Sequence, residues 1–284
     1  MPKVSVNGVA LYYEEHGEGV PILGLHGTPG SAALWAGAAV ALSNHGRCII
    51  FDRRGFHRSA LVPPPSTLDL IQHVDDAAAL LAALHAGPAV VIGPGTGGLI
   101  ALGLARHFPD KVKALVLLEP ALFTIDPDAD TWARGLRQRV LGASRDRPFG
   151  VAEVVMREAL GVQSWDALPG DIHEMLTHTS PAVLAEIRGR GLDLSDSPLE
   201  MNEDDLADIR RPSLILSAEG SPHVLRLITS RLSGALPYTE SVLVSGGHLI
   251  KSSTSRRSGL CRQNGCNIQF VGLASIEKIP PGGT

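Results

Sequence analysis

The sequence has no excess of basic residues and little cysteine, and both shortages exclude classes of protein. Its 25 Lys and Arg residues against 29 Asp and Glu residues give a formal net charge of −4. Nothing in this balance favours nucleic acid or an anionic membrane as a partner. The three cysteines (Cys48, Cys261 and Cys266) form neither a disulfide framework nor a zinc-binding spacing with nearby histidines. We therefore predict no metal and no cofactor.

Long apolar runs are also missing. No uninterrupted apolar stretch approaches the ~20 residues that span a bilayer, and the N-terminal MPKVSVNGVALYYEEHG lacks the regions of a secretory signal. We expect a cytoplasmic protein. Its 284 residues are 44% hydrophobic and 19% charged, which is typical of globular proteins, and they suffice for one large α/β domain or two small ones. The sequence does not indicate an oligomeric state.

Strand-like and helix-like patterns alternate along most of the chain. The opening KVSVNGVALYYEEHG alternates apolar and polar residues around Asn7-Gly8, which predicts a tight hairpin. Continuous apolar runs then predict buried strands, and apolar residues at helical spacing predict helices between them. The expected strands are 21–27, 47–52, 88–93, 113–120, 210–220 and 240–248, and the expected helices are 31–45, 71–84, 99–107 and 224–232. This order predicts an α/β fold with a mostly parallel, doubly wound sheet of eight strands.

The alternation breaks between residues 122 and 210. Helical patterns occur there at 131–141, 151–160 and 181–188, without a convincing strand. We expect a helical cap at 122–210 that covers the carboxyl edge of the sheet, where open α/β sheets bind ligands. The core would then comprise residues 1–121 and 211–250. The tail at 251–284 is atypical, either because it is foreign to the fold, through a frameshift or vector read-through, or because the native C-terminus is irregular.

Four motifs lie at the ends of expected strands. They are LHGTPG at 25–30, FDRRGFHRS at 51–59, GPGTGG at 93–98 and SGGHLI at 245–250. In this order, over about residues 3–250, the chain resembles the α/β-hydrolase superfamily. The resemblance implies an α/β-hydrolase fold and the ancestry of an esterase-like enzyme with a catalytic triad.

The third motif resembles the turn that carries the nucleophile in this superfamily. The double glycine and the helical pattern after it align Gly95 with the expected serine, so the position has no nucleophilic side chain. Thr96 would take this role only if the register slipped by one residue. The resemblance implies instead that the backbone N–H groups of Thr28 and Thr96 form the oxyanion hole.

The position of the expected acid is also occupied by glycine. The loop AEGSP at 218–222 places Gly220 where many members of the superfamily have aspartate. Glu119, at the end of an expected strand, is a candidate substitute acid, and its alternative role is a strand end held by backbone N–H groups. His248 follows the last expected strand, where the resemblance implies the general base.

Three functions remain open. The chain could be an ester- or acyl-bond hydrolase in lineage whose serine-type activity is weak or absent, which is the interpretation we favour. It could be a pseudo-hydrolase that binds a small ligand without catalysis, or a hydrolase in which His248 activates water. Because the insertion has few aromatic residues (Trp132, Phe149 and Trp165), we expect a mainly aliphatic pocket for a small apolar acyl group.

Overall fold

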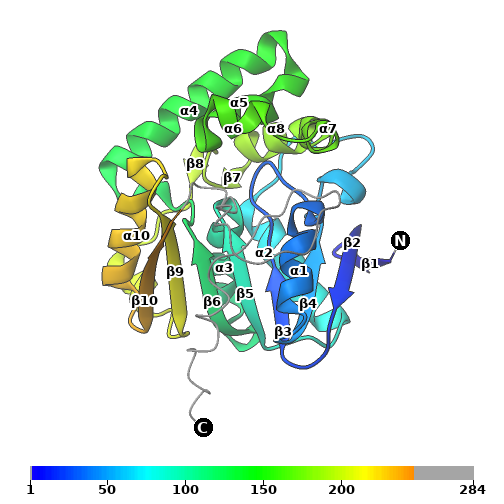
Figure 1. Ribbon diagram of the computed structural model, residues 1–284, viewed down its shortest axis with the longest axis vertical. Helices are drawn as coiled ribbons and strands as arrows, with labels where there is room; N and C mark the ends of the chain where they lie inside the picture. Colours follow the sequence, from blue (N-terminus) through cyan, green and yellow to red (C-terminus); the bar gives the residue numbers. More distant parts are fainter. Residues whose placement is uncertain (1, 246–284) are drawn as a thin grey trace, which may run out of the picture.

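Within the residues described by the computed structural model, 2–245, eight strands form one sheet in the order β1-β2-β4-β3-β5-β6-β9-β10 (Figure 1). Strands β1, β2 and β4 pair antiparallel, and every other neighbouring pair is parallel. The strands are β1 (Lys3–Val6), β2 (Val9–His16), β3 (Pro21–Gly24), β4 (Arg47–Phe51), β5 (Ala89–Pro94), β6 (Val112–Leu118), β9 (Ser213–Ala218) and β10 (Thr239–Val244). The predicted fold class is confirmed.

The first two strands meet at the predicted hairpin. Asn7 and Gly8 have φ angles of 48° and 77°, and two successive positive φ values define the mirror-image turn that matches the twist of paired strands. Asparagine and glycine tolerate this conformation better than other residues. The local sequence therefore determines how this edge of the sheet begins.

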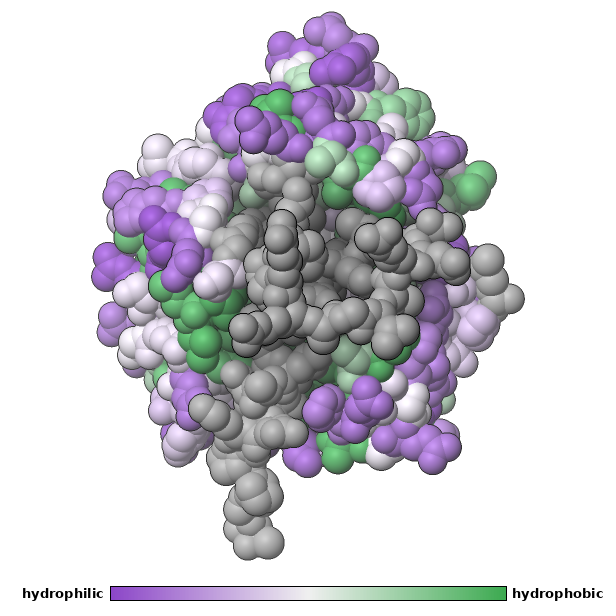
Figure 2. Space-filling model, viewed as in Figure 1, coloured by the Kyte–Doolittle hydropathy of each residue, from purple (hydrophilic) through white to green (hydrophobic). Residues whose placement is uncertain are grey.

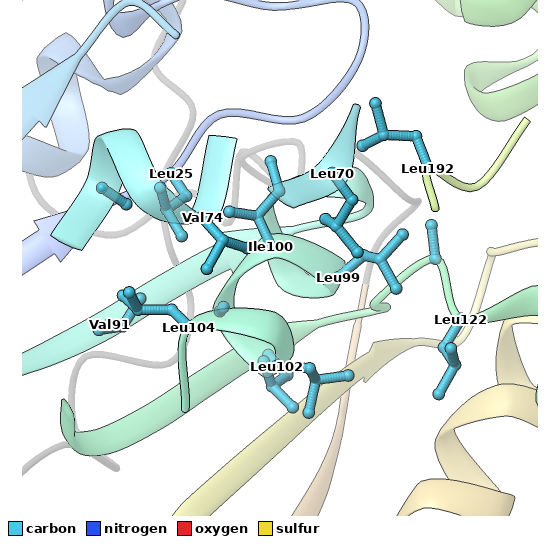
Figure 3. Close-up of a cluster of buried hydrophobic side chains, with 14 of the residues drawn as sticks. Leu25, Leu70, Val74, Val91, Leu99, Ile100, Leu102, Leu104, Leu122 and Leu192 are labelled. Atoms are coloured by element: carbon cyan, nitrogen blue, oxygen red, sulfur yellow. The ribbon is translucent and has the colours of Figure 1, made fainter. Parts of the chain in front are cut away.

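Helices cover both faces of the sheet. Alternate residues of β5 point to opposite sides, so that Val91 packs with α2 and α3, whereas Val90 and Ile92 pack with α1. Figure 3 shows the first of these cores, in which Ile100 of α3 lies beside Val74 of α2 and Leu99 of α3 lies beside Leu70 of α2. The helices around the sheet are α1 (Ala36–Leu42), α2 (Leu70–Ala83), α3 (Thr96–His107), α9 (Glu203–Ala207) and α10 (His223–Ala235).

A helical layer lies beyond one end of the sheet (Figure 1). It contains α4 (Pro127–Asp146), α5 (Val151–Leu160), α6 (Val162–Asp166), α7 (Gly170–His178) and α8 (Ser180–Arg188). Asp126 begins α4, because its carboxylate accepts hydrogen bonds from the N–H groups of Asp128 and Ala129. The expectation that this region lacks strands is wrong in one detail. Two-residue strands β7 (Arg190–Gly191) and β8 (Ser197–Pro198) pair with each other near its end.

The outside of this layer is polar. Hydrophilic residues dominate its surface in the view of Figure 2, above the sheet. Among residues 2–245, no helix combines the length and the apolar character that a membrane crossing requires. Leu136 and Val155 of this layer pack into the core beneath it and line the cavity there.

Candidate functional site

The turn between β5 and α3 forms the centre of the site. Gly95 precedes the first residue of α3 and has φ 51° and ψ −120°. The glycines two residues before and after it leave no room for a side chain, because a Cβ on Gly93 would lie 2.3 Å from the backbone of Gly97, and one on Gly97 would lie 2.3 Å from the carbonyl oxygen of Leu25. A Cβ on Gly95 would have no heavy atom within 4 Å. The chain thus bends sharply at a residue that has open space in front of it.

That space is a cavity of about 140 Å³ between the sheet and the helical layer. Gly95, Thr96 and Thr28 line it from the sheet, and Trp132, Val155 and Met156 line it from α4 and α5. The wall is mainly aliphatic, as expected, because leucines from several elements line it, among them Leu118, Leu136 and Leu225. Two aromatic residues that the expectation did not count also line the cavity: Trp35, within the expected helix at 31–45, and Phe123, at the start of the expected cap. Phe149 is 58% exposed.

The two threonines proposed for the oxyanion hole lie on the same cavity wall as Gly95. Thr96 is the first residue of α3, and an N–H group in the first turn of a helix has no acceptor within that helix. The side-chain hydroxyls point elsewhere. Thr28 donates to Glu186 Oε2 over 2.6 Å, and Thr96 lies 3.1 and 3.2 Å from the two carboxylate oxygens of Asp193. Both carboxylates belong to the inserted segment.

Glu119 follows β6 directly and is 4% exposed. Its carboxylate accepts hydrogen bonds from the Ala218 N–H and the Ser221 hydroxyl, each over 2.9 Å. These bonds tie the end of β6 to the loop after β9, which contains Gly220. Glu119 lines the cavity, whereas Gly220 is not among the cavity residues that the structure describes. His248 lies outside the described residues.

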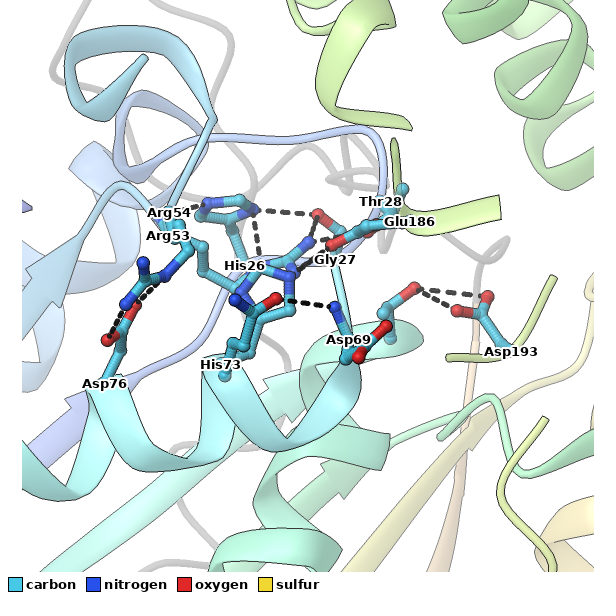
Figure 4. A network of polar contacts seen from close by, with 12 residues as sticks. His26, Gly27, Thr28, Arg53, Arg54, Asp69, His73, Asp76, Glu186 and Asp193 are labelled. Atoms are coloured by element: carbon cyan, nitrogen blue, oxygen red, sulfur yellow. Dashed lines mark hydrogen bonds and ion pairs between the residues drawn. The ribbon is translucent and has the colours of Figure 1, made fainter. Parts of the chain in front are cut away.

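A buried ionic cluster connects the inserted segment to the sheet (Figure 4). Arg53, after β4, donates to Glu186 Oε1 of α8 over 2.5 Å, and these side chains are 1% and 3% exposed. His73 Nε2 lies 2.9 Å from the same oxygen, although neither ring nitrogen of His73 has a well-directed hydrogen bond. Burial opposes ionisation of Glu186, but Arg53 outweighs it, and the pKa of this carboxyl falls from 4.5 to about 2.

His26 has a structural role. Its Nε2 accepts a hydrogen bond from the Arg53 N–H over 2.9 Å, and its Nδ1 lies 2.8 Å from the carbonyl oxygen of Gly27. Burial, followed by the nearby Arg53 charge, holds the pKa of His26 well below 6.5, so the ring is neutral at neutral pH. This ring therefore fixes the loop that carries Thr28.

Asp193 has no role in the sequence-based interpretation. It lies in the segment that connects β7 to β8, and it lines the cavity. Burial raises the pKa of its carboxyl to about 7, and the negative charge of Glu186 adds to the effect. Thr96 is 97 positions away in the chain, so no local pattern connects the two. The only signal was the general expectation that the inserted segment faces the ligand.

Comparison with known proteins agrees with this architecture. The sequence model of the α/β hydrolase fold matches residues 20–252, and the chain therefore belongs to this family. RutD of Azorhizobium caulinodans, provisionally named a carbamate hydrolase, is 27% identical over 268 residues, covering 89% of this chain and 94% of that protein. The haloalkane dehalogenase of Agrobacterium fabrum is 34% identical over 119 residues, 42% of this chain.

Some of these matches cover only part of the related protein. The aligned part spans 38% of that dehalogenase and 45% of the uncharacterised hydrolase YraK of Bacillus subtilis, less than half of either relative. Among solved structures, the N-acyl homoserine lactone degrading enzyme Est816 is 25% identical with a TM-score of 0.67, covering 87% of this chain and 93% of that one. A thermophilic esterase from Thermogutta terrifontis is 23% identical with a TM-score of 0.68, covering 87% and 91%, and it shows the shared fold.

Proposed function

We propose that this chain is a protein of ester- or acyl-bond hydrolase lineage in which Gly95 occupies the nucleophile position, so that serine-type activity is weak or absent. One observation carries the proposal. Gly95 stands at the sharp turn after β5, has a positive φ, and faces the cavity with no atom near its missing Cβ. Such a strand-to-helix turn displays the nucleophile in α/β hydrolases.

The proposed oxyanion hole uses backbone groups, and the proposed acid and base use side chains. The N–H groups of Thr28 and Thr96 would stabilise the oxyanion of an acyl substrate, and neither contribution depends on a side chain at position 95. We assign Glu119 as the substitute acid in place of Gly220, because its carboxylate binds the loop that contains Gly220. His248 is proposed as the general base on sequence position alone.

Residues 122–210 are proposed as the cap over the core formed by 1–121 and 211–250, because α4 and α5 supply one wall of the cavity. The wall is largely apolar, which favours a small apolar acyl compound as substrate or ligand. A second function, ligand binding without catalysis, is supported by the same cavity, since the cavity is formed although position 95 has no nucleophile.

Restoring the nucleophile tests the proposal. We expect Gly95→Ser to hydrolyse p-nitrophenyl butyrate on the order of 10- to 100-fold faster than the unaltered protein, because serine contributes most when histidine and acid are also in place. Gly95→Ala is the matched control: it adds the same Cβ without a hydroxyl and should give no gain. Adding Gly220→Asp to Gly95→Ser should raise the rate further.

A fluorophosphonate probe separates the alternatives. It should label Gly95→Ser and leave the unaltered protein unlabelled. If the unaltered protein hydrolyses the ester and is labelled, another residue is the nucleophile and the assignment of Gly95 is wrong. Hydrolysis without labelling would favour water activated by His248, and a His248→Ala variant would then lose it.

A further inference from the structure

The Asp193 carboxyl has no counter-ion among the described residues. Its donors are neutral: the Thr96 hydroxyl and the backbone N–H of Asp193 itself. The nearby cations pair with other acids: Arg53 binds Glu186 over 2.5 Å, Arg134 of α4 binds Asp130 over 2.8 Å, and Arg137 of α4 lies 3.2 Å from Asp196, although the Nε of Arg137 has no hydrogen-bond partner. Buried carboxylates in proteins are normally paired with a cation or held by several donors. The Asp193 carboxyl is half-buried at the wall of a cavity and forms no ion pair in the part of the chain that the structure describes.

The position of Asp193 is equally informative. Asp193 and Leu194 separate the main cavity from a smaller one of about 110 Å³, which Arg134 and Arg137 line from α4. On the side of the main cavity, Asp193 lies against Thr96, the first residue after the turn at Gly95. A ligand that reaches this turn therefore passes beside an acceptor with unused lone pairs.

The other polar groups of the main cavity have protein partners. His26 contacts Arg53 and Gly27, and the Thr28 hydroxyl binds Glu186. Glu119 binds Ala218 and Ser221. The remaining wall is mainly aliphatic and aromatic. Asp193 thus adds a carboxyl with spare acceptor capacity to a wall that is mainly apolar.

We propose that Asp193 is a specificity-determining residue that binds a cationic group, such as a primary ammonium, on the acyl part of the ligand. The proposal rests on the proposed function, because it assigns an amine-bearing acyl compound to the same cavity. The ligand would supply the missing counter-ion. An ionised carboxylate beside Thr96 would oppose an oxyanion there, and a cation would remove that opposition.

Several charged groups surround this carboxyl and set its titration. Glu186 from α8 and Arg53 after β4 act on it directly. The other titratable or charged residues that line the same cavities are His26, Glu119, Asp130, Arg134, Arg137 and Asp196. The nearest acid in effect is Glu186, which raises the pKa of Asp193 in addition to burial. Binding of an ammonium should therefore strengthen as the pH rises through about 7.

A matched pair of ligands tests the proposal without catalysis. 4-Aminobutanamide and pentanamide differ by an amine in place of a terminal methyl group, and their affinities for the full chain can be compared by calorimetry at pH 8. We expect the amine to bind at least 10-fold more tightly. Asp193→Asn keeps an acceptor for Thr96 and removes the charge, so it should abolish the preference. Asp196→Asn, 82% exposed in the same loop, should retain it.

Three results would overturn the proposal: equal affinity for the two amides, a preference that survives Asp193→Asn, or a preference that does not weaken at pH 6. Titration of the Asp193 carboxyl by ¹³C NMR gives an independent check, since a pKa below 4 in the free protein would mean that a cation of the chain already pairs with it. Activity of Gly95→Ser is a separate measurement. Its failure would contradict the assignment of Gly95 as the nucleophile position and leave the ligand comparison valid.

Discussion

The buried ion pair between Arg53 and Glu186 should be a major determinant of stability, and Glu186→Gln tests this. Gln keeps the shape of the side chain and removes its charge, leaving the Arg53 guanidinium buried without a counter-ion. The fall in the pKa of Glu186 from 4.5 to about 2 corresponds to about 3 kcal/mol of stabilisation at pH 7. Removing one partner of a buried pair generally costs about 3–5 kcal/mol, which agrees.

The sign of the pH dependence follows from the direction of the shift. Because the folded pKa of Glu186 is lower than the unfolded value, the stabilisation is complete above about pH 4.5 and is lost as the pH falls towards 2. The difference between Glu186→Gln and the unaltered protein should therefore be largest at neutral pH and should shrink in acid.

Urea unfolding followed by circular dichroism at pH 7, 4 and 3 measures both effects, and at pH 7 we expect the midpoint to fall by about 1 M. Glu174→Gln, at an exposed position of α7, is the control and should change nothing. The double variant Arg53→Met with Glu186→Met should recover most of the loss, because no unpaired charge remains. A loss below about 1 kcal/mol at pH 7, or an equal loss at every pH, would refute the reasoning.

Two further predictions concern the same region. Asp193→Asn should stabilise the protein at pH 8.5 by about 2 kcal/mol and have little effect at pH 4. The pKa of the Asp193 carboxyl is raised in the folded protein, so folding stability is lost as the pH rises from 3.8 through about 7. Melting temperatures at the two pH values would check this prediction, and a change that does not depend on pH would contradict it. Gly97→Ala should destabilise by about 3 kcal/mol or more, because its Cβ would lie 2.3 Å from the Leu25 carbonyl oxygen. Gly142→Ala, whose Cβ would meet nothing in α4, should instead stabilise slightly, and urea midpoints would distinguish the two.

Features set by neighbouring residues were predictable from the sequence. Asn7-Gly8 determines its own turn, and the apolar run at 89–92 determines a strand that is covered on both faces. The expected helix at 151–160 matches α5 in both limits. The expected helix at 31–45 is divided, because Ala32–Trp35 forms a 3-10 turn before α1. The residues that determine the turn at Asn7-Gly8, the strand and α5 lie within a few positions of one another. The change from a 3-10 turn to an α-helix after Trp35 is the exception.

Contacts between distant segments were not predictable. Glu186 and Arg53 are 133 positions apart, and an acid within a helical pattern is ordinarily exposed. Trp35 and Phe123 line the cavity only because the chain folds the loops after β3 and β6 to the same edge of the sheet. Short helices α6 and α7 also escaped prediction, because five to nine residues give too little periodicity to recognise. The assignments of six site residues remain predictions: Thr28, Gly95, Thr96, Glu119, Gly220 and His248.

The tight packing around the turn after β5 has an evolutionary consequence. The bend is held by backbone contacts of Gly93 and Gly97, so a substitution at position 95 itself leaves those contacts intact and adds only the strain of a side chain at positive φ, about 1–3 kcal/mol. A glycine codon of the form GGT or GGC becomes a serine codon by one base change. Under the proposed assignment of Gly95 as the nucleophile position, a single mutation would switch reactivity at this bend on or off while the fold stays the same.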